Sequence, residues 1–270
     1  MKRPSAAAKK RVRQSRAGKK PLAWRWHNGA LQAIAFPQAV QLDDLLGIDR
    51  QKAALVQNTL QFVQKKPANH VLLTGARGTG KSSIVKALLT NFSAQGLRLV
   101  EVAAHDLTAL PDVVAPLRGK PERFILYVDD FSVAANDTAL TVLKTALDGG
   151  IEDPPENVLI YATSNRRYLM PEQKRDNQEY HWENDELHPG ESTEEKISLS
   201  ERFGLWLSFP PFNQEQYLEL VRLHLSKLGV NALDEDGEKL ALRWALNRAS
   251  RSGRVAQQFA RDWAGRHGAG

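Results

Sequence analysis

The chain has 270 residues, 42% hydrophobic and 25% charged, which allows one large domain or two smaller ones with a buried core. No run approaches the roughly 18 consecutive apolar residues that a membrane helix needs, so we expect no integral membrane segment. The sequence contains no cysteine, which excludes disulfides and thiolate metal sites and fits a reducing, cytoplasmic location.

Positive charge is concentrated at the N-terminus. The first twenty residues hold nine basic side chains, and the first acidic residue is Asp43. The rest of the chain has the other 28 of the 37 basic residues against 31 acidic ones. We predict that residues 1–23 form a basic disordered tail. Two interpretations stay open: the tail binds nucleic acid or another polyanion, or it is a solvated leader without a partner.

The segment that follows the tail has few periodic apolar residues. Residues 24–42 are predicted to form short extended pieces around Gly29 and Pro37. Trp24 and Trp26 flank an arginine, an arrangement that can stack on bases, but we expect both rings to pack against the domain.

From residue 49 onward, apolar runs alternate with helical patterns. A first helix is predicted over 49–65, with Asp49 as its N-cap. The runs that predict buried strands are 70–75, 97–102, 124–128, 158–162 and 205–209. The helices predicted between the first four are 81–94, 108–118 and 138–148. This alternation predicts a parallel five-stranded sheet with helices on both faces.

The last part of the chain reads as helical only. Three amphipathic helices are predicted after residue 213, so we divide the chain into an α/β domain over 24–211 and a small helical domain over 212–270. Residues 171–198 are charged and predicted to be a long loop or insertion. Its histidines and acids, from His181 to His188, do not have the spacing of a metal site.

A glycine-rich sequence between the first strand and its helix predicts a phosphate-binding loop. Residues 75–82 read GARGTGKS and match the pattern G-x-x-x-x-G-K-S/T in its proper context. The glycines let successive N–H groups face phosphate oxygens, Lys81 is expected at the β- and γ-phosphates, and Ser82 at Mg²⁺. The predicted nucleotide-binding residues of this loop are Gly75, Ala76, Arg77, Gly78, Thr79, Gly80, Lys81, Ser82 and Ser83.

Two carboxylates end the apolar run 124–128. Asp129 is expected to hold Mg²⁺ together with Ser82, and Asp130 to polarise the attacking water. The alternative is a pair of solvated acids at a strand end. The expected ligands are therefore ATP and Mg²⁺.

In these motifs, and from about residue 42 to residue 264, the chain resembles the AAA+ ATPases. LIYATSN, residues 159–165, is similar to their sensor 1 strand, which implies that Asn165 reaches the γ-phosphate and the lytic water. SERFG, residues 200–204, resembles the segment that presents an arginine finger, which implies a catalytic Arg202 in a neighbouring subunit's site. Arg254 opens the last helix as sensor 2 arginines do, which implies a nucleotide contact.

The resemblance implies a three-layer P-loop NTPase with a helical lid, assembled as a homo-oligomer. GARGTGKSS and VLIYATSNRR also make the chain similar to an uncharacterised bacterial family of AAA-type proteins. Asp130 stands where many AAA+ ATPases carry glutamate, which bears on turnover and not on binding. Rival interpretations are a salt bridge of Arg202 within its own subunit and a solvated Arg254.

Three functions compete on this reading. The first is an ATPase that hydrolyses ATP to drive conformational change in an oligomer. The second is an ATP-dependent switch or loader that acts on a nucleic-acid complex with little turnover. The third is a monomeric P-loop kinase, against which the lid arginine and the SERFG segment argue.

Overall fold

The computed structural model describes residues 20–131, 137–149, 153–165, 181–183, 186–188, 199, 201–230 and 233–267. The strands are β1 (Ala23–His27), β2 (Ala30–Ala33), β3 (Val71–Gly75), β4 (Leu97–Ala103), β5 (Arg123–Asp129), β6 (Val158–Ser164), β7 (His181–Glu183), β8 (Glu186–His188) and β9 (Leu205–Phe209). The α-helices are α2 (Asp49–Val63), α3 (Lys81–Phe92), α4 (Leu110–Val114), α5 (Asp137–Asp148), α7 (Gln214–Lys227), α8 (Glu235–Asn247) and α9 (Gly253–His267). Short 3-10 helices are η1 (Leu42–Asp44), η2 (Ser93–Gln95) and η3 (Ala104–Ala109).

The central sheet has the strand order β2-β1-β4-β5-β6-β3-β9. All five predicted strands are present, and neighbours among them run parallel. The predicted number of strands was wrong, because β1 pairs parallel with β4 and β2 pairs antiparallel with β1, which makes seven. Asn28 and Gly29, both at positive φ, close this hairpin, and Asn-Gly is the strongest short hairpin signal in a sequence.

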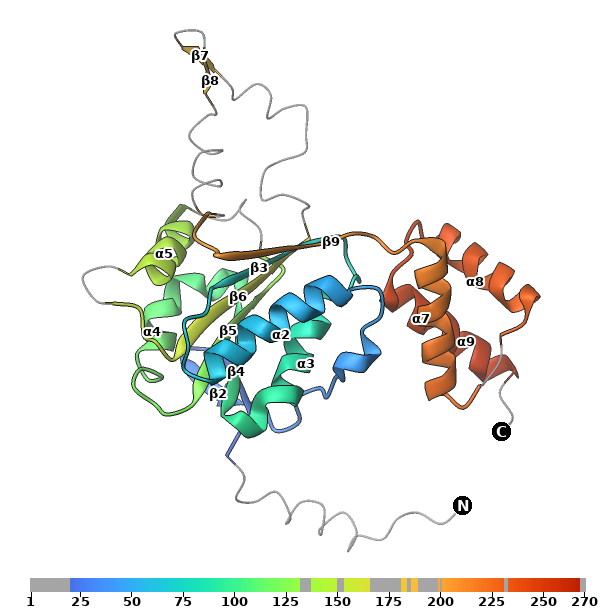
Figure 1. The fold of residues 1–270 in the computed structure, drawn as a ribbon, viewed down its shortest axis with the longest axis horizontal. Helices are drawn as coiled ribbons and strands as arrows, with labels where there is room; N and C mark the ends of the chain where they lie inside the picture. Colours follow the sequence, from blue (N-terminus) through green and yellow to red (C-terminus); the bar gives the residue numbers. More distant parts are fainter. Residues whose placement is uncertain are drawn as a thin grey trace, which may run out of the picture.

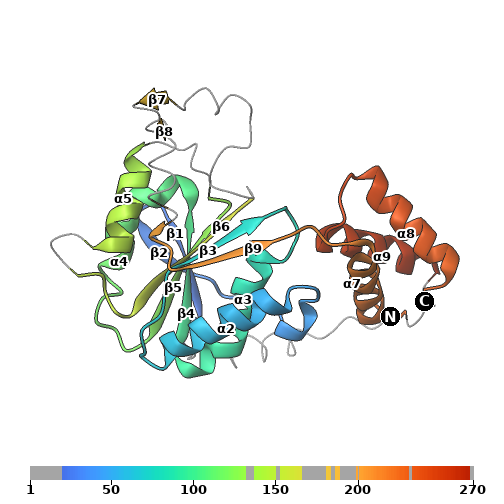
Figure 2. The ribbon, with the colours of Figure 1, turned by 45° about the horizontal axis from the view of Figure 1, so that its top comes forward.

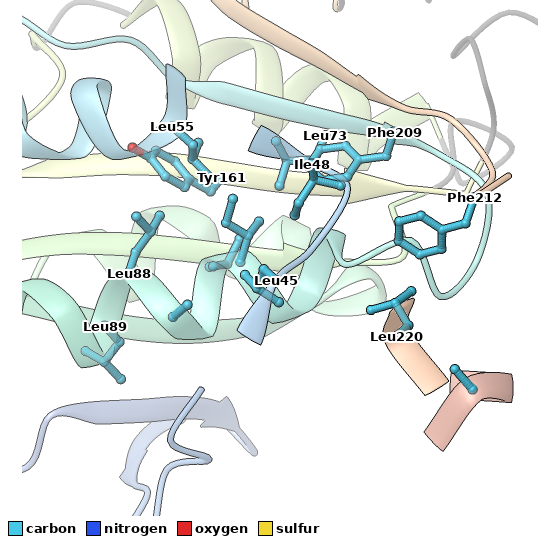
Figure 3. Close-up of a cluster of buried hydrophobic side chains, with 14 of the residues drawn as sticks. Leu45, Ile48, Leu55, Leu73, Leu88, Leu89, Tyr161, Phe209, Phe212 and Leu220 are labelled. Atoms are coloured by element: carbon cyan, nitrogen blue, oxygen red, sulfur yellow. The ribbon is translucent and has the colours of Figure 1, made fainter. Parts of the chain in front are cut away.

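Helices cover both faces of the sheet, which gives the three predicted layers (Figures 1 and 2). Alternate residues of each strand point to opposite faces. On one face, Tyr127 of β5 and Tyr161 of β6 join the core beneath α2 and α3. On the other, Leu126 and Ile160 join the core beneath α4 and α5. Figure 3 shows part of the first core, where Leu55 and Leu88 reach toward Tyr161.

Local details confirm one expectation at the start of the fold and correct another. Trp26 is buried, and the Trp24 ring lies 6.2 Å from the ring of Phe124, so both tryptophans pack against the domain. Asp49 is not an N-cap, because it is the first residue of α2 and follows Ile48, which occupies the cap position.

The helices α7, α8 and α9 form a bundle beside the sheet (Figures 1 and 2). Asn213 and Gln216 form a capping box that starts α7 immediately after β9. Leu220 of this bundle joins the core with Phe212 and Leu45 (Figure 3), and Lys227 pairs with Asp44 of η1 at 2.6 Å. The bundle therefore packs on the segment that precedes α2.

Parts of the predicted tail and insertion lie outside the described residues. Residues 1–19 are among them, and β1 begins at Ala23, inside the range predicted for the tail. Within the predicted insertion, β7 and β8 form an antiparallel pair. Across the described ranges, no helix is long and apolar enough to span a bilayer.

Candidate nucleotide-binding site

The predicted phosphate-binding loop connects β3 to α3 and depends on two of its glycines. Gly75 has φ +131°, and a Cβ there would lie 2.1 Å from the carbonyl oxygen of Phe209. Gly78 has φ +74°, and a Cβ there would lie 2.7 Å from Cβ of Ser252, at the start of α9. The N–H of Gly253 also donates to the carbonyl of Gly78 at 2.9 Å. The loop therefore packs against the helical bundle as well as against the sheet.

Replacing Gly78 with alanine tests this packing. The positive φ alone costs a non-glycine residue about 1–2 kcal/mol of folding stability. Gly119 has nearly the same φ, +73°, with nothing within 4 Å of a Cβ, so Gly119→Ala carries the backbone cost without the clash. We expect similar losses of unfolding free energy from backbone strain in the two variants, with an added loss only in Gly78→Ala. Denaturant unfolding measures the loss, and identical behaviour of the two variants would refute the contact.

Lys81 is buried at the mouth of the loop. Its ammonium donates to the carbonyls of Gly75 and Ala76, both at 2.7 Å, and to Oδ1 of Asn165 at 3.1 Å. Burial lowers the pKa of Lys81 to about 8, against the opposing charges of Asp129 and Asp130. A cation that is short of solvent and surrounded by loop carbonyls gains from an anionic ligand at this place.

The metal-side oxygens predicted from two distant motifs lie together. Ser82, in the first turn of α3, donates its hydroxyl to Oδ1 of Asp129 at 2.9 Å. The pKa of Asp129 lies below its ordinary value. Burial raises it, but hydrogen bonds from the hydroxyls of Thr163, Tyr127 and Ser82, together with the charge of Lys86, outweigh burial. The carboxylate is therefore ionised at neutral pH. A hydroxyl beside a carboxylate is a hard oxygen set that suits Mg²⁺.

Asp130 turns away from the strand and joins a second polar network. Its φ is +54°, in the left-handed region that aspartate tolerates better than most residues. Its Oδ1 accepts a hydrogen bond from Nδ2 of Asn165, and its Oδ2 lies 3.8 Å from a guanidinium nitrogen of Arg77. Because Asn165 also contacts Lys81, one amide links the predicted catalytic carboxylate to the loop lysine.

Thr163 of β6 is a residue of this site that the sequence reasoning missed. Its hydroxyl donates to Oδ1 of Asp129 at 2.6 Å and accepts from the N–H of Asp130 at 3.0 Å. One hydroxyl thus contacts both the carboxylate of Asp129 and the backbone of Asp130. The available signal was its spacing, because Thr163 lies two residues before Asn165 and strand residues two apart share a face.

A cleft of about 770 Å³ opens between the loop, the sheet edge and the helical bundle. Arg77, Gly78, Thr79, Gly80, Lys81, Ser82, Ser83, Asp129, Asp130, Asn165 and Arg254 all line it, so the structure brings these predicted residues together. Gly75 and Ala76 contribute through the carbonyls that hold Lys81. The apolar part of the lining consists of Val40, Leu45, Leu46, Ile48, Phe212 and Leu220. The cleft therefore has a polar, cationic end and an apolar end.

Arg202 is the one predicted site residue that the structure places elsewhere. Arg202 precedes β9. The first residue of β9 pairs with Val71, and the last pairs with Gly75, where the loop begins. Arg202 therefore lies at the end of the strands opposite the loop. There its guanidinium forms an ion pair with Asp148 at the end of α5. This is the intrasubunit salt bridge weighed as the rival interpretation, and it separates Arg202 from the cleft of its own chain.

The parallel strand order, the glycine loop after β3 and the adjoining helical bundle define a three-layer fold of the AAA+ P-loop type. The chain belongs to the family described as protein of unknown function DUF815, which matches residues 19–267. The expected relation to an uncharacterised AAA-type family is thereby confirmed. No curated protein matches the sequence.

Solved structures of RuvB from Thermotoga maritima, a Holliday junction branch migration motor, have a similar fold. One is 17% identical with a TM-score of 0.55 and covers 83% of this chain and 65% of its own. A variant of it is 16% identical with a TM-score of 0.57 and covers 87% and 68%. The chain thus spans about 65% of the length of the first of these proteins. At this identity the likeness shows the fold alone.

Proposed function

We propose that the protein is an ATPase that binds Mg·ATP in the cleft and hydrolyses the β–γ phosphoanhydride bond to drive conformational change. We place the triphosphate at the cationic end of the cleft and adenine at the apolar end. Bound Mg²⁺ would neutralise charge on the phosphate oxygens. We further propose that the chain acts as a homo-oligomer in the cytoplasm, with residues 212–270 as a mobile lid.

The polar and charged residues of the site have distinct roles in this proposal. Ser82 and Asp129 hold Mg²⁺, and Lys81 binds the terminal phosphate. Asp130 orients water for attack, and Asn165 positions Asp130 while contacting the same phosphate. Arg202 completes the site of a neighbouring subunit. Arg254, on the second residue of α9, connects the lid to the nucleotide.

The observation that carries the proposal is the convergence of Lys81, Ser82 and Asp129. The 2.9 Å hydrogen bond joins residues 47 positions apart in sequence. Among the described residues, the hydrogen-bond acceptors of Lys81 are the carbonyls of Gly75 and Ala76 and the amide of Asn165, and none is a carboxylate. A lysine kept only for stability is normally paired or solvated, whereas this one is 5% exposed.

Lys81→Ala is expected to abolish nucleotide binding and phosphate release together. Lys66→Ala is the control for the loss of one positive charge, since Lys66 is exposed in the segment that follows α2. Isothermal titration with ADP and Mg²⁺ measures binding, and phosphate release without any acceptor separates an ATPase from a kinase. Wild-type protein that binds neither ATP nor ADP would defeat the proposal.

A second candidate is a switch or loader on a nucleic-acid complex with little turnover. The clustered positive charge of residues 1–20 favours it, and RuvB, which has a similar fold, is a Holliday junction branch migration motor. Deletion of residues 1–19 keeps Lys20, which contacts Glu122 at 3.3 Å. Salt-dependent DNA binding that disappears with this deletion would support the candidate. Binding that survives the deletion would argue against the tail as its contact.

A further inference from the structure

The positive charge of the N-terminal tail continues onto the folded domain. The tail joins the domain at Lys20, whose ammonium contacts Oε1 of Glu122 at 3.3 Å, immediately before β5. The pKa of Glu122 lies below its ordinary value, because of a backbone hydrogen bond and because of the charges of Lys20 and of Arg98 in β4. Since β4 and β5 run parallel and Asp129 ends β5 at the cleft, the tail meets the domain at the opposite, amino end of the sheet.

Arg123, the first residue of β5, adds a buried positive charge at this end. Its side chain donates to the carbonyl of Glu156, and its guanidinium carbon lies 5.3 Å from the centre of the Phe62 ring, near the end of α2. Neither of these contacts carries a formal negative charge. The field of Arg123 therefore adds to that of the cations around it.

Three exposed lysines surround the same place. Lys65 and Lys66 follow Phe62 and the end of α2. Lys120 lies in the segment before β5, and its carbonyl accepts from Nδ2 of Asn157 at 3.1 Å, which holds this segment beside the start of β6. Chain segments that are distant in sequence thus bring lysines to one end of the sheet.

Few acids oppose these cations. Among the described residues of the segments that lead into β5 and β6, the acidic ones are Glu122, Asp153 and Glu156, and Lys20 and Arg98 already act on the first of them. We call the accessible cations of the domain at this end the basic surface, and its members are Lys65, Lys66, Arg98 and Lys120.

We propose that the basic surface binds the phosphate backbone of duplex DNA together with the tail. Duplex DNA carries about one negative charge per 1.7 Å of its axis, so one duplex offers phosphates to the tail and to the surface at the same time. A membrane suits this charge less well, because residues 1–20 contain no leucine, isoleucine, phenylalanine or tryptophan to anchor a basic segment in the lipid interface. The inference goes beyond the proposed ATPase and depends on no step of it, since the surface and the cleft lie at opposite ends of the sheet.

The test combines Lys65→Gln, Lys66→Gln and Lys120→Gln in the full chain. Arg98 is kept, because its guanidinium also bonds to the carbonyls of Ser93 and Leu97. Binding of a short fluorescent DNA duplex is measured by anisotropy at several salt concentrations. Each lysine that contacts a phosphate adds about one unit to the slope of log K against log salt concentration. We expect the slope of the combined variant to fall by about two to three units, and each single substitution to lower it by about one.

The matched control removes the same charge from the helical bundle. Lys239→Gln, Arg243→Gln and Arg266→Gln, combined, replace exposed side chains of α8 and α9. This variant should keep the wild-type slope, because the contact depends on where the charge lies and not on the net charge. Thermal unfolding of both variants shows whether the fold is retained, and the single substitutions carry the test if the combined variant unfolds.

Three results would overturn the inference. These are wild-type protein that does not bind the duplex, an unchanged slope in the lysine variants, and an equal fall in the control variant. Binding to phosphatidylserine vesicles that the lysine variants lose, without any effect on duplex binding, would assign the surface to a membrane and overturn it as well. Protein that binds the duplex through these lysines but binds no nucleotide would overturn the proposed ATPase and leave this inference standing.

Discussion

Arg202→Ala should lower phosphate release by about 10³-fold while nucleotide binding stays at the wild-type level. The arginine lies at the sheet edge opposite the loop of its own chain, so it has no access to its own nucleotide. A guanidinium supplied by the next subunit stabilises charge that develops in the transition state and contributes little to binding. The measurements are phosphate release and ADP titration on the same preparation.

Mixing variants tests whether the arginine acts in trans. Arg202→Ala subunits have an intact loop, and Lys81→Ala subunits have an intact arginine. Each variant alone should be inactive, whereas a mixture should recover activity at interfaces that combine the two. Head-to-tail contacts of this kind generate rings or open helices. Recovery that is absent from the mixture would contradict the shared site.

The ion pair with Asp148 requires its own control. If Arg202 served only to hold α5 against the start of β9, Asp148→Asn would lower phosphate release as strongly as Arg202→Ala. We expect Asp148→Asn to change turnover only a few-fold, because the arginine remains and a partly exposed ion pair contributes about 0–1 kcal/mol to stability. Equal losses in the two variants would make Arg202 a structural residue.

Local patterns in the sequence were enough for the framework of the fold. β9 has the predicted bounds, 205–209, and the predicted phosphate-binding loop connects a strand to a helix as expected. Buried parallel strands are continuous apolar runs in the sequence. The G-x-x-x-x-G-K-S/T pattern between a strand and a helix is specific for a phosphate-binding loop. The convergence of Ser82 and Asp129 also followed, because the carboxyl ends of parallel strands meet at one edge of the sheet.

What the sequence did not predict depends on contacts between distant segments. Thr163 is unremarkable as a strand residue until β6 lies beside β5, where its hydroxyl reaches both aspartates. Gly78 is explained only in part by the loop motif, because Ser252 fills the space where its side chain would be. The pairing of β1 with β4 likewise has no local signature, although the Asn28-Gly29 turn marks the hairpin.

Asp130→Asn should reduce phosphate release by about 10²–10⁴-fold, the range that general acid–base groups contribute. An amide is isosteric with the carboxylate but cannot accept the proton of an attacking water. Binding should persist, because Lys81 donates to the carbonyls of Gly75 and Ala76 and to Asn165, not to Asp130. Phosphate release and ADP titration on one preparation measure both properties, and loss of both together would contradict this division of roles.

Asp130→Glu is the matched variant, since it keeps the charge and adds the methylene that many AAA+ ATPases have. Asp130 has a left-handed backbone, its N–H donates to the hydroxyl of Thr163, and its carboxylate accepts from Asn165. A longer side chain on this backbone places the carboxylate beyond Asn165. We therefore expect Asp130→Glu to bind nucleotide normally but to turn over more slowly than wild type, by less than Asp130→Asn does. Faster turnover of Asp130→Glu would show that the length of the side chain limits hydrolysis, and not the hydrogen bonds of Asp130 with Thr163 and Asn165.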